Sequence, residues 1–196
     1  MDSRYKYLIK NTGILTISSF STKILTFLMV PLYTSVLTTE EYGTYDLAVS
    51  TVSLLIPILS VNIVDGVMRY SMDSRYDRAD IFSIGLRRIS VAAFIFAAIL
   101  AANSVFHITN VFAGEELLIL LYFISTLLYS LLTQFAKGCE AVKQMAIAGI
   151  ISTVCLVGTN ILLLLVFELG VTGFFIASCA SQLIPCLLYT SDAADD

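Results

Sequence analysis

The run "VAAFIFAAILAANSVF", residues 91–106, decides the fold class, because it is apolar on every side of any helix it could form. A second run, "NILLLLVF" at residues 160–167, has the same character. Strands of a membrane barrel alternate apolar and polar residues over about ten positions, whereas membrane helices are continuously apolar. Both runs therefore predict transmembrane helices rather than a β-barrel.

The composition extends this prediction to the whole chain. Of the 196 residues, 58% are hydrophobic and 13% are charged, whereas soluble domains are about half apolar and about a quarter charged. A helix needs about 20 apolar residues to cross a hydrocarbon core of about 30 Å. We therefore predict an all-α, polytopic membrane bundle of about six transmembrane helices. Their expected positions are residues 12–37, 45–69, 85–107, 116–136, 145–167 and 170–188.

The basic residues predict the orientation, since loops rich in Lys and Arg stay in the cytoplasm. All basic residues except Lys23 fall before the first stretch, around the connection between the second and third, or between the fourth and fifth. The alternate connections, "TTEEYG", "ITNVFAGEE" and "ELG", contain acidic residues and no basic one. We expect a cytoplasmic N-terminus and a multi-pass protein of the cell inner (cytoplasmic) membrane. Gly43, in the first of these connections, is expected to supply a tight turn.

The last residues, "CLLYTSDAADD" at 186–196, differ in character from the chain before them. They resemble the translation of a transposase adapter used in sequencing libraries. We therefore expect residues 1–185 to form an N-terminal six-helix transmembrane lobe and residues 186–196 to be an adapter-derived tail. A natural acidic tail is the alternative. Without Asp192, Asp195 and Asp196 the formal net charge changes from −4 to −1, so the charge balance does not indicate a partner.

The first stretch contains a single lysine, in the segment "SSFSTKILTF". On a helix of about 3.6 residues per turn, it shares one stripe with Thr12, Thr16, Ser19 and Thr26. Lys23 lies about eleven residues, or about 16 Å, from the inner end of the stretch, which is close to the membrane midplane. A charge at that depth usually faces an aqueous cavity or a partner. We predict a substrate cavity for an anionic ligand, lined by Lys23, Thr16, Ser19 and Thr26. A lysine buried against carbonyls or an acid, with a packing role only, is the alternative.

The second stretch contains Pro57, in "LLIPILS". Proline predicts a loosened or bent helix, because it lacks the backbone N–H and its ring clashes with the preceding turn. Before it, Asp46, Ser50 and Ser53 share one face, and after it Asn62, Asp65 and Arg69 share another. Asp65 and Arg69 are four residues apart and are expected to pair. We interpret Asp65, Asn62 and Pro57 as candidate coupling or gating residues and Arg69 as a further cavity residue. A structural ion pair at the inner membrane edge is the alternative.

The sequence contains no recognisable catalytic arrangement. The only histidine, His107, lies near the outer end of the third stretch and is expected to be interfacial. The four cysteines lack the spacing of a zinc or redox site. The acidic pairs at 40–41 and 115–116 fit solvated loops better than catalysis or metal binding. We expect no enzyme, no cofactor, no metal site and no nucleic-acid partner.

Residues 11–70 resemble the start of the Wzx-type polysaccharide flippases, a family of the multidrug/oligosaccharidyl-lipid/polysaccharide exporter superfamily. The resemblance is most specific in "PLYTSVLTTEEYGTYDL", residues 31–47, and in "DGVMRY", residues 65–70. It implies two six-helix lobes around a central cavity, of which this chain would be the first. It also implies alternating access, by which undecaprenyl-pyrophosphate-linked oligosaccharide reaches the outer leaflet for surface polysaccharide biosynthesis. The implied partners are this substrate, membrane lipid and polysaccharide assembly proteins.

Three other functions remain open at this point, one of which is a non-transporting membrane scaffold. A multidrug antiporter of the same superfamily would favour acidic cavity residues, whereas the deepest charge here is a lysine. A polytopic membrane enzyme acting on lipid-linked sugars would need catalytic carboxylates or a large outer loop, and the sequence offers neither.

Overall fold

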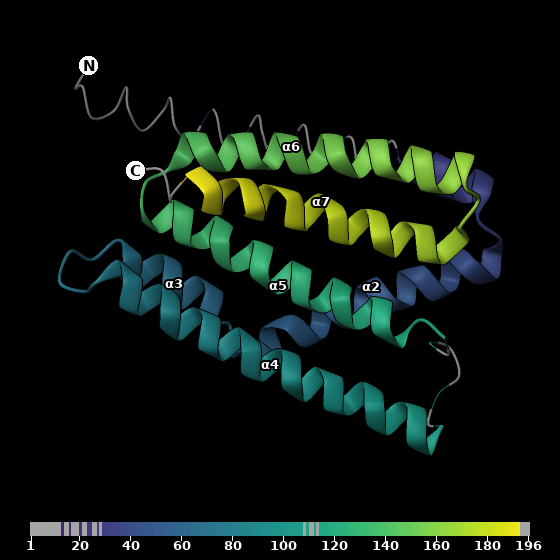
Figure 1. The fold of residues 1–196 in the computed structure, drawn as a ribbon, viewed down its shortest axis with the longest axis horizontal. Helices are drawn as coiled ribbons and strands as arrows, with labels where there is room; N and C mark the ends of the chain where they lie inside the picture. The colour runs from purple at the N-terminus through teal and green to yellow at the C-terminus, as the bar shows by residue number, and fades with distance from the viewer. Residues whose placement is uncertain are drawn as a thin grey trace.

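The computed structural model describes residues 13, 16, 20, 23, 24, 27, 29–107, 109, 112 and 114–192. Residues 29–36 form the end of a first helix, which carries no label in Figure 1. The elements that follow are α2 (Thr39–Ser60), α3 (Ile63–Ser71), α4 (Arg78–Phe106), α5 (Glu116–Gly138), α6 (Val142–Asn160), the π-helical segment η1 (Ile161–Val166) and α7 (Gly170–Asp192). The described part of the chain contains no strand. The prediction of an all-α protein is therefore confirmed.

Among the described residues, five helices are long and apolar enough to cross a membrane. They are Thr39–Ser60, Arg78–Phe106, Glu116–Gly138, Gln144–Val166 and Gly170–Leu187. These helices overlap the second to sixth predicted stretches, which confirms a polytopic helical bundle. Most of the first predicted stretch lies outside the described residues. The proposal that residues 186–196 are foreign stays a prediction.

Two helices begin earlier than predicted because capping side chains precede the apolar runs. α2 begins after Thr38, whose hydroxyl accepts a hydrogen bond from the Glu41 backbone N–H at 3.2 Å, while the Glu41 carboxylate accepts from the Thr38 N–H at 2.8 Å. This reciprocal capping box starts the helix at Thr39 instead of residue 45. Gly43 consequently lies inside α2, and the predicted turn there is wrong. In the same way, Asp77 caps α4 by accepting from the Ala79 N–H at 2.9 Å.

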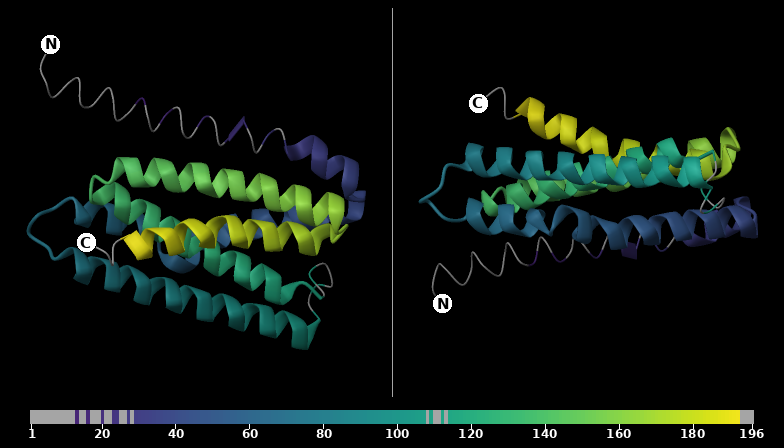
Figure 2. Two further views of the ribbon diagram at one scale, coloured as in Figure 1. Left: turned by 45° about the horizontal axis from the view of Figure 1, so that its top comes forward. Right: turned by 90° about the horizontal axis from the view of Figure 1, so that it is seen from below.

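α5 lies in the middle of the bundle, with α6 and α7 on one side and α3 and α4 on the other (Figures 1 and 2). The rings of Phe96 on α4 and Phe123 on α5 stack with centroids 4.3 Å apart. Leu127 and Leu131 on α5 and Phe175 on α7 are also fully buried. The central helix thus supplies much of the core that joins the two sides.

Two glycines bring α3 into close contact with its neighbours. A Cβ atom on Gly138 of α5 would lie 2.6 Å from the Ser71 Cβ and 2.7 Å from the Met68 carbonyl oxygen. A Cβ atom on Gly85 of α4 would lie 2.7 Å from a methyl of Leu131 and 2.8 Å from a methyl of Val67. Small residues allow membrane helices to approach this closely. α3 is therefore held tightly between α4 and α5.

An aromatic cluster joins the first helix, α2 and α7 near the end of the bundle where α2 begins. Tyr33 is almost completely buried, and its ring centroid lies 5.4 Å from that of Phe174. The ring of Tyr45 on α2 lies 4.0 Å from the same phenylalanine. The residues of the "PLYTSVLTTEEYGTYDL" segment therefore serve a structural role here, through ring packing and the helix cap.

Candidate functional site

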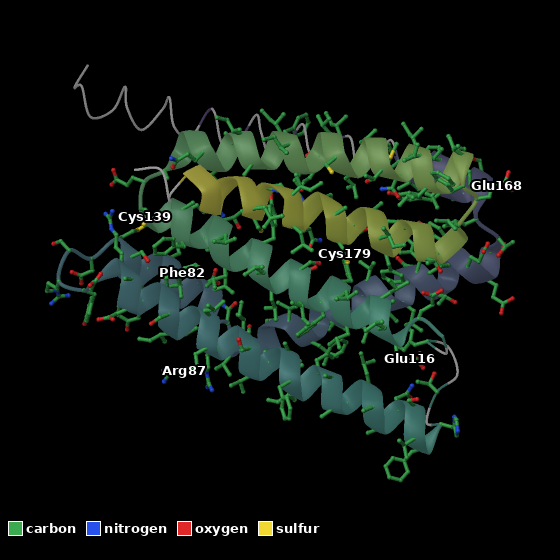
Figure 3. The ribbon with its side chains drawn as sticks, viewed as in Figure 1. Phe82, Arg87, Glu116, Cys139, Glu168 and Cys179 are labelled. Atoms are coloured by element: carbon green, nitrogen blue, oxygen red, sulfur yellow. The ribbon has the colours of Figure 1, made fainter. Side chains whose placement is uncertain are left out.

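The basic residues of α3 to α5 gather at one end of the bundle, together with several acidic ones such as Asp73 and Asp77. The α3–α4 and α5–α6 connections lie at one end and are flanked by Arg69, Arg75, Arg78 and Lys137. The other end contains Glu116 and Glu168, far from Cys139 in Figure 3. We call these the basic end and the acidic end. The stretch from Ile89 to Phe106 in α4 contains no charged residue and is about 27 Å long at 1.5 Å per residue. Arg87 and Arg88 precede this stretch on the basic side, and Arg87 points away from the bundle in Figure 3.

Two acids at the acidic end have structural partners, contrary to the solvated-loop interpretation. Glu41 completes the cap of α2. Glu115 is half-buried, and its Oε1 accepts a hydrogen bond from the Thr172 hydroxyl at 2.8 Å. The carboxylates thus fasten α2 and connect α5 to α7. The sequence reading missed this role because the partner of Glu115 lies 57 positions away in the chain.

α2 presents three distinct faces. One is polar and exposed, and it is formed by Asp46, Ser50 and Ser53, with Pro57 on the same side; the four residues lie within about 60° of one another on the helix. A second is apolar and exposed, with Leu54 and Ile58 exposed by 68% and 67%. The third faces the core and contains Ala48 and Val52, which are at most 1% exposed. Lipid suits the apolar exposed face, whereas the polar exposed face requires water or a partner.

The helix breaks after Ser60, four residues beyond the position that Pro57 led us to expect. Val61 and Asn62 both adopt left-handed backbone conformations, with φ of 53° and 49°. The Asn62 N–H bonds to the Pro57 carbonyl at 3.1 Å and so closes the end of α2. A left-handed conformation is costly for a β-branched residue such as Val61. The predicted single helix over 45–69 is thus wrong, and α3 is a separate helix.

Asp65 is bound by two amides rather than by an arginine. The Asn62 side-chain amide donates to Oδ2 at 2.7 Å, and the Gln134 side-chain amide of α5 donates to Oδ1 at 2.8 Å. Among the described residues, the only ion pair joins Asp73 and Arg75. The expected pairing of Asp65 with Arg69 is therefore wrong, and each carboxylate oxygen accepts from an amide instead. Arg69 itself is exposed.

Gln134 is a site residue that sequence reasoning missed. Its side chain is half-buried, and its Oε1 atom is buried without a hydrogen-bond partner. A lone amide in the apolar helix "ELLILLYFISTLLYSLLTQFAKG" was the available signal. Its partner could not have been foreseen, since 69 positions separate Gln134 from Asp65.

Lys23 and Thr16 are helical and exposed, as a cavity role requires. Phe20 and Phe27 are exposed on the same helix by 66% and 73%. The exposed surface of the first helix is therefore mixed, and the cavity role of Lys23 and Thr16 stays a prediction. Ser19, Thr26 and Thr12 lie outside the described residues.

A second feature that the sequence did not indicate is a pocket of about 360 Å³ between α3 and α4. Its walls include Ile63, Val67, Tyr70 and Ile84, with Tyr76 from the connecting loop. The rings of the two tyrosines pack edge to face at 5.5 Å. Because the lining is almost wholly apolar, this pocket is unsuited to a sugar or a phosphate.

Comparison with known proteins gives one match. No curated protein and no solved structure matches the chain. The family described as "Polysaccharide biosynthesis protein" matches residues 8–190, which is nearly the whole sequence. Together with the five helices that are long and apolar enough to span a membrane, this match indicates a membrane protein of the polysaccharide-related transporter type. The chain therefore belongs to the polysaccharide biosynthesis protein family.

Proposed function

We propose that this chain is the first lobe of a flippase that moves undecaprenyl-pyrophosphate-linked oligosaccharide across the cytoplasmic membrane by alternating access. The role is transport rather than catalysis. The substrate's sugar and pyrophosphate would pass through a polar cavity between this lobe and a second one, while its lipid tail stays in the bilayer.

The polar exposed face of α2 is the observation that carries this proposal. Asp46, Ser50 and Ser53 lie on the outside of the bundle over about two helical turns, next to a separate apolar face. Polar groups in a membrane almost always face the bundle interior or a water-filled cavity. In a polysaccharide biosynthesis protein, a hydrated face of this length suits a carbohydrate, which needs many hydrogen-bond partners.

The charge distribution supports the direction of transport. The positive-inside rule assigns the basic end to the cytoplasm. Arg69 lies at that end, in the last turn of α3, and Lys23 would lie near the midplane. Two cationic side chains at successive depths suit a substrate whose anionic pyrophosphate enters from the cytoplasm.

Labelling of single cysteines tests the cavity directly. The native cysteines are first replaced by alanine, and Ser50→Cys or Ser53→Cys is then treated with a membrane-impermeant maleimide in sealed vesicles. We expect both positions to react, because the cavity contains water. Leu54→Cys is the matched control on the lipid-facing side of the same helix, at 68% exposure, and it should stay unlabelled. Equal reactivity of all three positions would contradict the proposal.

Transport is tested in the full-length gene. We expect Lys23→Ala to reduce surface polysaccharide and to leave lipid-linked oligosaccharide in the inner leaflet. Undiminished surface polysaccharide in this variant would contradict a cavity role for Lys23. If expression of the full-length gene gives resistance to cationic drugs and has no effect on surface polysaccharide, an antiporter is favoured instead.

A further inference from the structure

The position of Asp65 is fixed from two elements. Asn62 comes from the break that precedes α3, and Gln134 comes from the middle helix of the bundle. Their amides donate to the two different carboxylate oxygens, at 2.7 Å and 2.8 Å. Because Gly138 and Gly85 hold α3 against α5 and α4, the distance from Gln134 to Asp65 has little freedom to change.

Arg69 would otherwise be the natural partner of this carboxylate. An acid four residues before a base on one helix is the favourable order for an ion pair. The two residues have this spacing on α3, yet the described structure contains no ion pair between them. The guanidinium of Arg69 is instead exposed on the polar side of α3, away from the apolar pocket.

We infer that Gln134 is a positioning residue that holds Asp65 away from Arg69, so that Arg69 stays available for the pyrophosphate of the substrate. Guanidinium groups bind phosphate oxygens through paired hydrogen bonds, which an ion pair with Asp65 would prevent. Gln134 itself does not touch the substrate. This inference rests on the proposed function, since it assigns the anion contact within the same cavity.

The test measures binding of farnesyl diphosphate to the whole chain in nanodiscs. Gln134→Leu removes the donor to Asp65 Oδ1, leaves the bond from Asn62, and lets the freed oxygen pair with Arg69. We expect this variant to bind the probe about tenfold more weakly, which is the effect of losing one charge-assisted contact. Gln144→Leu, a matched change at an exposed glutamine of α6, should bind like the unchanged chain.

A double variant separates positioning from simple damage. In Gln134→Leu combined with Asp65→Asn, the competing carboxylate is gone, so Arg69 should be free again and the affinity should return to within about twofold of the unchanged chain. A merely structural role for Gln134 predicts no such rescue. Weak binding by the double variant would therefore overturn the inference.

Arg69→Ala distinguishes this inference from the proposed function. We expect about tenfold weaker binding, with no further loss when Gln134→Leu is added. If Arg69→Ala binds the probe normally, the anion contact lies elsewhere, and the inference fails while the flippase proposal stands. If the unchanged chain does not bind the probe, both the substrate class and this inference are wrong.

Discussion

The close approach of α5 to α3 at Gly138 leads to a quantitative prediction for Gly138→Ala. The added Cβ would lie 2.7 Å from the carbonyl oxygen of Met68, and ordinary van der Waals contact begins at 3.4 Å. The two helices would therefore have to separate by at least 0.7 Å, the difference between these distances. The obstructing atoms are backbone and Cβ atoms, so no flexible side chain can move away instead.

Overpacking of this kind costs about 1–3 kcal/mol. Alanine also gains up to about 1 kcal/mol over glycine in a helix interior, but Gly138 is the last residue of α5, where that gain is small. We therefore expect the free energy of unfolding to fall by about 1–2 kcal/mol. Unfolding in mixed detergent micelles, followed by circular dichroism, measures this change.

Gly158→Ala is the matched control, since a Cβ there meets nothing within 4 Å. This variant should be more stable than the unchanged chain by about 0.5–1 kcal/mol, because only helix propensity changes. Equal stability of the two alanine variants would refute the packing argument. Gly138→Ala should also weaken the hydrogen bond from Gln134 to Asp65, because that contact crosses the same interface.

Three further predictions concern single residues outside the substrate contacts. Val61→Gly should raise the free energy of unfolding by about 0.5–1 kcal/mol, because glycine adopts the left-handed conformation without strain. Ile58→Gly is the control, since it is similarly exposed but lies in the preceding helical turn. This variant should lower the free energy of unfolding by about 1 kcal/mol. Thr38→Ala should lower the free energy of unfolding by about 1 kcal/mol, because the α2 cap is lost. The neighbouring control Thr39→Ala should change it little. Equal effects of the two variants would argue against the cap. The hydrogen bonds from Arg75 lower the pKa of Asp73. The ionised Asp73 carboxylate therefore stabilises the loop fully above the ordinary aspartate pKa. This stabilisation is lost as the pH falls through the lowered pKa. Carboxyl NMR titration should show this pKa returning toward normal in Arg75→Gln, and an unchanged pKa would contradict it.

The helices and their order were predictable because each membrane crossing is a continuous apolar run. The ends were less predictable, since Thr38 and Asp77 start helices in polar segments that hydropathy assigns to loops. The break at Val61–Asn62 was not predictable from Pro57, because a left-handed valine has no local sequence signal. Five helices of the described residues are long and apolar enough to span a membrane where six were expected, because most of the first stretch lies outside those residues.

The polar residues of the candidate site were found more readily than their partners. Periodicity placed Asp46, Ser50 and Ser53 on one face, and the structure exposes that face. The same reasoning paired Asp65 with Arg69, since it considers only neighbours on one helix. Gln134 reaches Asp65 from a helix that is distant in sequence, and such contacts depend on tertiary packing.

The length of α4 affects which molecules can reach the basic end. Its 29 residues extend about 43 Å, whereas the hydrocarbon core is about 30 Å thick. An average membrane tilt of about 20° shortens the projected length only slightly. The loop between α3 and α4 must therefore stand clear of the lipid surface, with Arg75 in the loop and Arg78 at the start of α4. Both arginines are cleavage points for trypsin, so a soluble protease added to one side of sealed vesicles would reveal the sidedness of the protein without any label or substitution.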